Sequence, residues 1–209
     1  MFIERPPKLH RLLLPGAVWR MDNASRKSVY LTFDDGPVPE VTPQVLDILD
    51  RHNVKATFFV VGDNVRKHPE LFEQIKKNGH SFGNHTMHHL QGLKNSCEFY
   101  LADIEEAGKL IGSSLFRPPH GLMKRCQNKR LKERYTIVMH DVLTRDYGRR
   151  VTPRIVIENV KRFTRPGSII VFHDSEKARR NILASLEESI LWLKHNGYEL
   201  LPIPMPSNP

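Results

Sequence analysis

The sequence predicts an α/β fold of parallel strands and helices, closed into a barrel rather than laid out as an open sheet. Short apolar runs alternate with longer segments of helical period along the chain, a pattern typical of parallel sheets. Polar residues capable of chemistry follow one predicted strand after another, as in barrels that carry their active sites at the strand ends. No Gly-rich phosphate-binding motif follows a strand, so a nucleotide-binding open sheet is not supported.

Each predicted element is delimited by residues that begin or end regular structure. The predicted strands are 29–33, 56–61, 81–83, 136–140, 168–172 and 198–201, with an extended entry into a turn at 115–117. The predicted helices are 42–52, 69–78, 97–111, 123–134, 152–163 and 181–195. We expect Thr42 to cap the first helix, with Pro43 at its first position. Gly79, Gly112 and Gly197 are expected to end the helices that they follow.

Length and composition indicate one globular domain with a short appendage. The 209 residues are 39% hydrophobic and 26% charged, and no Gly/Ser linker divides them. We expect a basic, Pro-containing N-terminal arm over residues 1–27 and a single domain over residues 28–209. Cys97 and Cys126 are too few for a disulfide scaffold or a four-thiolate zinc module.

The arm lacks the features of an export signal. Its apolar run Leu12-Leu13-Leu14 stops at Pro15-Gly16, whereas a signal needs roughly 7–15 apolar residues in a row. No run in the chain approaches the roughly 18 apolar residues of a membrane span. A cytoplasmic location is the default expectation, and contact of the basic arm with an anionic membrane or envelope surface is left open.

The positive charge has a simple explanation in solvated helix surfaces. The chain has 32 basic and 23 acidic residues, a formal charge of +9. Basic pairs such as Lys76-Lys77 and Arg149-Arg150 are scattered over predicted helix ends, and aromatic residues do not alternate with them. We therefore expect no nucleic-acid partner, while an anionic polymer stays compatible with the charge.

Adjacent carboxylates follow the first predicted strand. Asp34 and Asp35 precede Gly-Pro, so they stand at a strand end in a tight turn. Neighbouring residues in extended backbone point in opposite directions, so the two acids are expected to differ in role unless the turn re-aims one of them. A metal ligand beside a base is one such division, and a plain turn is the alternative.

Paired histidines follow the third predicted strand. His85 and His89 are four positions apart, so on a helical turn their rings would share one face and could share a metal ion. His88 would lie on another side, in solvent or behind the ligands. Two histidines and one carboxylate would leave coordination positions open for water and substrate, as catalytic metal sites require.

Further polar residues follow the later strands. Arg117 precedes Pro118-Pro119, whose rigid backbone could hold the guanidinium against a carboxylate or simply form a stiff surface loop. A polar stretch at 139–147 includes Asp146. His173 ends the apolar run before it and could serve as an acid catalyst.

Together these motifs resemble those of the NodB-type polysaccharide deacetylases, carbohydrate esterase family 4. The resemblance extends from about residue 29 to 201. Thr-Phe-Asp-Asp-Gly-Pro at 32–37 is the family's first motif, and the segment 85–89 matches His-Ser/Thr-x-x-His. Residues 117–121 match Arg-Pro-Pro-x-Gly, and 172–174 match the final motif. The resemblance implies an irregular (β/α)7 barrel.

The resemblance also implies a role for each motif residue. It makes Asp34 the catalytic base, positioned by Arg117, and His173 the general acid. The implied metal ligands are Asp35, His85 and His89.

This chain departs from the usual pattern in the fourth motif, which spans residues 143–147. Leu143 replaces its first acid and Tyr147 its Trp, whereas Asp146 is kept and is expected to orient Arg117 or His173. His120 stands where a Tyr or Phe is commoner. None of the replaced residues is an implied metal ligand, so we expect the chemistry to persist and the choice of substrate to be affected.

The implied reaction is metal-assisted removal of acetyl groups from N-acetylated amino sugars of a peptidoglycan- or chitin-like glycan. Zinc suits the two-histidine, one-carboxylate set, and cobalt, manganese or nickel could also occupy it. Alternatives are an O-acetyl ester such as acetylated xylan, or a small amide, on the same site. A non-catalytic carbohydrate-binding barrel is an alternative of another class, but it would have no use for the full set of acids and histidines. No partner protein is predicted.

Overall fold

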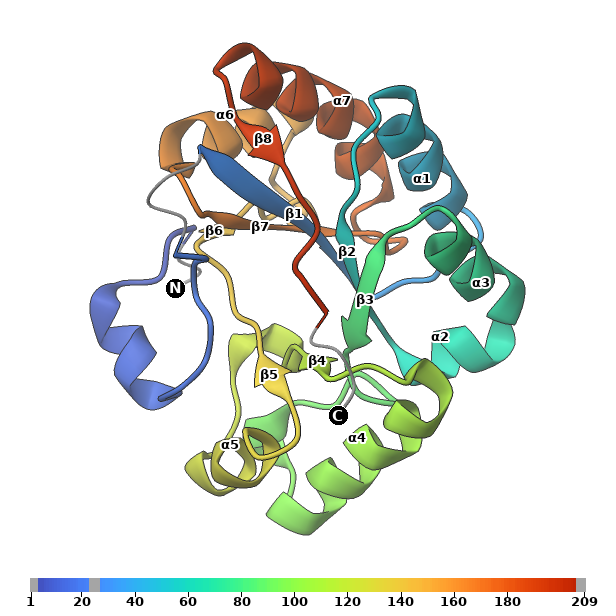
Figure 1. Ribbon diagram of the computed structural model, residues 1–209, viewed down its shortest axis with the longest axis vertical. Helices are drawn as coiled ribbons and strands as arrows, with labels where there is room; N and C mark the ends of the chain where they lie inside the picture. The colour runs from blue at the N-terminus through green and yellow to red at the C-terminus, as the bar shows by residue number, and fades with distance from the viewer. Residues whose placement is uncertain (1–3, 23–26, 206–209) are drawn as a thin grey trace.

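Parallel strands lie at the centre of the molecule and helices surround them (Figure 1). The computed structural model describes residues 4–22 and 27–205. Its strands are β1 (Ser28–Asp34), β2 (Thr57–Val60), β3 (Ser81–Asn84), β4 (Leu115–Phe116), β5 (Thr136–Ile137), β6 (Val142–Leu143), β7 (Ile169–His173) and β8 (Glu199–Leu200). Its α-helices are α1 (Thr42–Arg51), α2 (Gly62–Lys67), α3 (Pro69–Lys77), α4 (Cys97–Ile111), α5 (Arg125–Leu131), α6 (Pro153–Phe163) and α7 (Arg179–His195). Short 3₁₀ helices cover η1 (Lys8–Leu13), η2 (Gly92–Lys94) and η3 (Pro119–Gly121).

The strands pair in the order β5-β4-β3-β2-β1-β7-β6, and β8 pairs with the start of β1. Each of these pairings is parallel. Parallel strands bring their carboxyl ends to one edge, so the loops that follow β1, β3, β4 and β7 meet there. The predicted α/β fold class is confirmed as an irregular barrel, with β5 and β6 at the two ends of its sheet.

The described part of the N-terminal arm connects the two sides of this sheet (Figure 1). Val18 N donates a hydrogen bond to Ile137 O in β5 (2.8 Å), and Met139 N donates to Val18 O (2.7 Å). Met21 N donates to Gly167 O (2.9 Å), just before β7. The bonds to Ile137 and Met139 engage backbone groups that β5, as an end strand, would otherwise leave unpaired. The arm thus contributes to the barrel wall, and the domain boundary after residue 27 stays a prediction.

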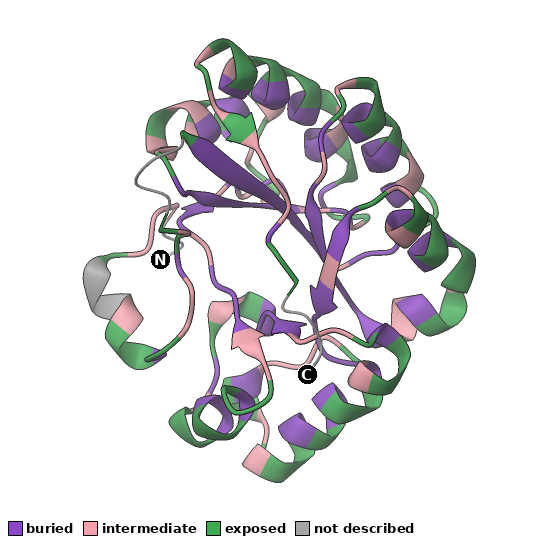
Figure 2. Ribbon diagram, in the orientation of Figure 1, coloured by how far each residue is buried: buried purple, intermediate pink, exposed green. Residues whose placement is uncertain are grey.

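Helices bury the face that they turn toward the sheet and expose the other (Figure 2). All 7 residues of β1 are buried, which is typical of a strand covered on both sides. In α1, the buried Val45, Leu46 and Leu49 recur with the helical period. Leu14 and Trp19 of the arm are also buried, in a second hydrophobic cluster. No helix among the described residues combines the length and apolarity required to cross a membrane.

Local sequence determines the ends of α4. The helix covers Cys97–Ile111, as predicted. The Ser96 hydroxyl accepts a hydrogen bond from Phe99 N at its start (3.2 Å), which satisfies one of the unpaired N–H groups of the first turn. Gly112 ends the helix with φ +67°, a left-handed conformation that glycine adopts without strain.

The prediction that Thr42 caps α1 is wrong. Val41 is the residue before the helix, and no side chain caps α1. The Thr42 hydroxyl accepts a hydrogen bond from Val38 N (2.7 Å) and donates one to Asp174 Oδ2 (2.6 Å). The buried carboxyl group of Asp174, at a distant strand end, therefore bonds the hydroxyl that local sequence assigned to the cap.

Short elements account for the other differences from prediction. Strand β6 was not predicted, β4 was predicted only as an extended entry, and each covers 2 residues, too few to show a periodicity. Helix α2 directly follows β2 and was missed, and α5 covers 7 residues rather than the predicted span 123–134.

Candidate active site

The backbone reverses between Asp34 and Asp35 at the end of β1. Asp34 is the last residue of β1, and Asp35 has φ +83°, so the turn re-aims its side chain. Gly36 N donates to Asp174 Oδ1 (3.1 Å), and a Cβ at Gly36 would lie 1.9 Å from Asp174 Oδ2. Only glycine allows this close approach, so the Asp174 side chain fixes the turn that presents Asp35. Burial raises the pKa of Asp174 to about 8.

The histidine pair converges, but not on a helical turn as predicted. Residues 85–91 are irregular, and Thr86 (φ +68°) and His89 (φ +54°) are left-handed. The rings of His85 and His89 nevertheless lie 5.2 Å apart, centroid to centroid. His88 points away and bonds Asp103, whose carboxylate also accepts the Met87 and His88 backbone N–H groups. Asp103 on α4 therefore sets the shape of this loop.

Asp35, His85 and His89 form a group that could hold a metal ion. Their ligand atoms all lie within 4.8 Å of one another. Asp35 Oδ1 is 3.1 Å from His89 Nε2 and 3.7 Å from His85 Nε2. Burial would raise the pKa of Asp35, but the hydrogen bond from His89 and the neighbouring imidazoles lower it, so the carboxylate is charged.

The protonation of His85 fits a cation at this position. Its Nδ1 lies 2.8 Å from Arg117 O, and since a carbonyl oxygen can only accept, Nδ1 carries the proton. Burial lowers the pKa of His85 to about 4, so the ring is neutral and its Nε2 presents a lone pair toward the Asp35 carboxylate. Two electron-rich atoms that face each other in this way are suited to a shared cation.

Arg117 joins the ends of β4 and β1, as expected of a positioning residue. Its Nη1 donates to Asp34 Oδ1 (2.6 Å) and to Thr32 Oγ1 (2.7 Å). Its other nitrogens donate to the carbonyl oxygens of Val138 (3.2 Å) and Met139 (2.9 Å). The guanidinium is buried and fully engaged, so it fixes the orientation of the Asp34 carboxylate.

His173, next to Asp34 at the end of the neighbouring strand β7, forms a pair with Asp146. Asp146 Oδ1 lies 2.8 Å from His173 Nδ1, and Oδ2 accepts the His173 backbone N–H at 2.7 Å. Burial alone would lower the pKa of His173, but the charge and hydrogen bond of Asp146 raise it to about 9. Of the two partners expected for Asp146, the structure places His173 next to it.

A cavity of about 330 Å³ is lined by Asp34, Asp35, His85, His89, Arg117 and His173. Its lining also includes His120, His140, Leu143 and Tyr147, and Lys177 reaches it from the loop after β7. His140 belongs to the polar stretch 139–147 noted in the sequence, without a role assigned to it. Lys177 was missed, because it follows its strand end by several residues and no motif includes it.

Aromatic rings form part of this lining. The Tyr147 ring meets that of His173 edge-on, with centroids 4.7 Å apart, and His120 lies 4.9 Å from His89. Burial, assisted by the charge of Arg117, lowers the pKa of His140 to about 4 and keeps its ring neutral. The substituted positions of the fourth motif therefore form pocket wall rather than metal ligands.

Comparison with known proteins gives consistent similarities. Residues 21–135 match the family described as polysaccharide deacetylase. The chain is 36% identical over 193 residues to a peptidoglycan-N-acetylglucosamine deacetylase of Bacillus cereus, covering 88% of this chain and 90% of that protein. It is 33% identical to a chitooligosaccharide deacetylase of a Bradyrhizobium strain, covering 88% and 92%. A crystal structure of a peptidoglycan N-acetylglucosamine deacetylase with a bound N-hydroxybenzamide superposes with a TM-score of 0.84 at 34% identity, covering 90% and 91%.

Proposed function

This chain belongs to the polysaccharide deacetylase family, and we propose that it hydrolyses the acetamide groups of N-acetylated amino sugars in a peptidoglycan- or chitin-like glycan. One observation carries the proposal. The Asp34 carboxylate, held by Arg117, and the His173 imidazole, held by Asp146, line one cavity. The same cavity is lined by the three candidate metal ligands Asp35, His85 and His89. Amide hydrolysis needs a base, an acid and a means of polarising the carbonyl, and this cavity contains residues for each.

Asp35, His85 and His89 would hold the divalent cation. Zinc is our assignment because it accepts a mixed nitrogen and oxygen set and leaves coordination positions open in catalytic sites. Bound there, the cation would lower the pKa of water toward neutrality and stabilise negative charge on the acetamide oxygen.

Asp34 is the base in this proposal. Its side chain is almost entirely buried, and the Arg117 guanidinium binds Oδ1. Held in one orientation, the carboxylate takes the proton of the attacking water without having to reorganise. Arg117 is a positioning residue because its donors point to Asp34, Thr32 and backbone carbonyls rather than into the cavity.

His173 is the acid. Its raised pKa keeps the ring protonated at neutral pH, and Nδ1 is engaged by Asp146, so the Nε2 proton remains for the substrate. An amine leaves poorly as an anion and needs this proton as the carbon–nitrogen bond breaks. An acetyl ester has a better leaving group and depends less on such an acid.

Acetate release tests the proposal. N-acetylglucosamine oligomers, peptidoglycan and acetylated xylan would be incubated with zinc-loaded and chelator-stripped protein, with Asp34→Asn as the inactive control. We expect zinc-dependent acetate from the amino-sugar substrates. Acetate from xylan alone would make the chain an esterase, and no acetate from any substrate despite bound metal would support a carbohydrate-binding role instead.

A further inference from the structure

A second groove, of about 360 Å³, lies next to the catalytic cavity, and Gly121 lines both. Its apolar lining comes from the arm, from η2 and from the segment that leads into α5. The apolar lining side chains are Leu13, Leu14, Trp19, Leu93, Leu122 and Met123, and Lys124 and Arg125 also line the groove. Segments far apart in sequence thus form one apolar surface.

Three of the leucines that line this groove are exposed. Leu13 is 47% exposed, Leu93 50% and Leu122 44%. Single exposed leucines are ordinary on a soluble protein, but a group around one groove is typical of an interaction surface. We call these three side chains and the groove the leucine surface.

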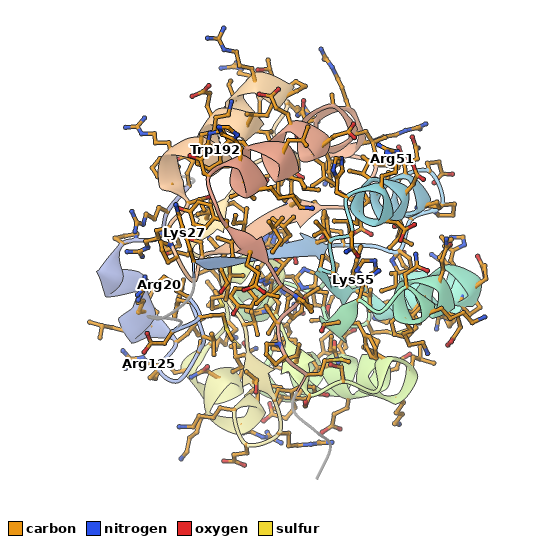
Figure 3. The ribbon with its side chains drawn as sticks, turned by 45° about the horizontal axis from the view of Figure 1, so that its top comes forward. Arg20, Lys27, Arg51, Lys55, Arg125 and Trp192 are labelled. Carbon is orange, nitrogen blue, oxygen red and sulfur yellow. The ribbon has the colours of Figure 1, made fainter. Side chains whose placement is uncertain are left out.

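Positive charge accompanies the leucine surface. Arg125 is exposed and projects from the side of the molecule that carries the arm (Figure 3). The ammonium group of Lys124 donates to Asn95 O (2.7 Å), which ties η2 to the start of α5. No acidic side chain among the described residues lines the groove.

We propose that the leucine surface docks the protein on an anionic phospholipid bilayer, with the leucines entering the interface and Lys124 and Arg125 binding headgroups. Peripheral membrane binding combines buried apolar area with attraction to anionic lipid, and this surface supplies both. Docked in this way, the enzyme would act close to the membrane surface.

Vesicle sedimentation tests the proposal. The protein would be mixed with vesicles of phosphatidylcholine alone or with one-quarter phosphatidylglycerol, in about 0.1 M salt. We expect binding to the anionic vesicles, weakened by high salt because exposed charges are screened. The triple variant Leu13→Ser, Leu93→Ser, Leu122→Ser and the single variant Arg125→Glu should each lower the partition coefficient about tenfold.

Matched controls lie on other faces of the molecule. Leu191→Ser on α7 removes a leucine that is 51% exposed, and Lys109→Glu on α4 reverses an exposed charge. Both should bind like the parent chain. The proposal is overturned if the control variants lose as much vesicle binding as the test variants, or if the parent chain does not bind the anionic vesicles. It is also overturned if the parent chain forms a dimer that the triple variant alone dissociates, because the surface would then bind a second copy. Hydrolysis of soluble oligomers should be unchanged in all variants, which separates docking from catalysis.

Discussion

The two sides of the catalytic cavity are built by different forces. The side at the ends of β1, β3, β4 and β7, which we call the acid–base side, consists of polar groups that hydrogen-bond one another, such as Asp34 with Arg117 and His173 with Asp146. The side near β5 and β6 consists of rings and a leucine that pack against neighbours, such as Tyr147 against His173. Reaction chemistry and substrate selection can therefore change independently in this molecule.

The described part of the N-terminal arm supports the second side. Trp19 is buried, and its ring lies 6.3 Å from that of His140, which lines the cavity. Arg145, near the end of β6, forms an ion pair with Glu4 at 2.6 Å. The following variants are designed to test this division, in decreasing order of their expected effect on turnover.

The largest effect is expected at Asp34. Asp34→Asn keeps the size of the side chain but removes the base, so kcat should fall by about 10²–10⁴-fold while zinc content is unchanged. His85→Ala should lose both zinc and turnover. Acetate release and metal content, measured on the same preparations, check both variants. Substantial zinc-dependent turnover in Asp34→Asn would remove Asp34 from the role of base.

Asp146→Asn should have the next largest effect. His173 must be protonated to act as acid, and its pKa of about 9 means that turnover falls as pH rises through that value. Without the Asp146 charge the pKa of His173 drops, so we expect this decline at lower pH and kcat about tenfold lower near pH 8. A pH profile of kcat measures the shift. An unmoved alkaline limb would show that another group supplies the proton.

Tyr147→Trp and Leu143→Asp, which restore the usual residues of the fourth motif, should have smaller effects. Both positions line the cavity without belonging to the metal-ligand group, so we expect KM for oligomers of different length to change by about threefold and kcat to stay similar. Steady-state kinetics on a series of N-acetylglucosamine oligomers measures both constants. A tenfold fall in kcat would place these side chains in the chemistry.

Trp19→Ala should affect turnover least and stability most. Removing a buried Trp lowers the free energy of unfolding by about 3 kcal/mol, whereas Leu12→Ala, at a site 68% exposed, should change it by less than about 0.5 kcal/mol. Urea unfolding measures both values. Equal stability of the two variants would mean that the arm is not part of the folded barrel wall.

Much of the acid–base side could be predicted from sequence, because its residues follow strands that the apolar pattern identifies. Asp34 and His173 each end a strand, and parallel pairing places them directly opposite each other. The convergence of His85 and His89 was predicted for the wrong reason, since left-handed residues and Asp103 shape their loop rather than a helical turn. A four-residue spacing alone does not distinguish the two conformations.

The sequence by itself determined the alternation of strands and helices, the ends of α4 and the identity of the acids and histidines at the strand ends. These features depend on side-chain period, on capping residues and on the shared edge of a parallel sheet, all of which are local or general. Only the tertiary structure decided that Thr42 bonds Asp174, that Trp19 packs near His140 and that Asp146 holds His173. Each of these contacts joins segments that are distant in the chain, so the partner is selected by packing rather than by neighbouring residues.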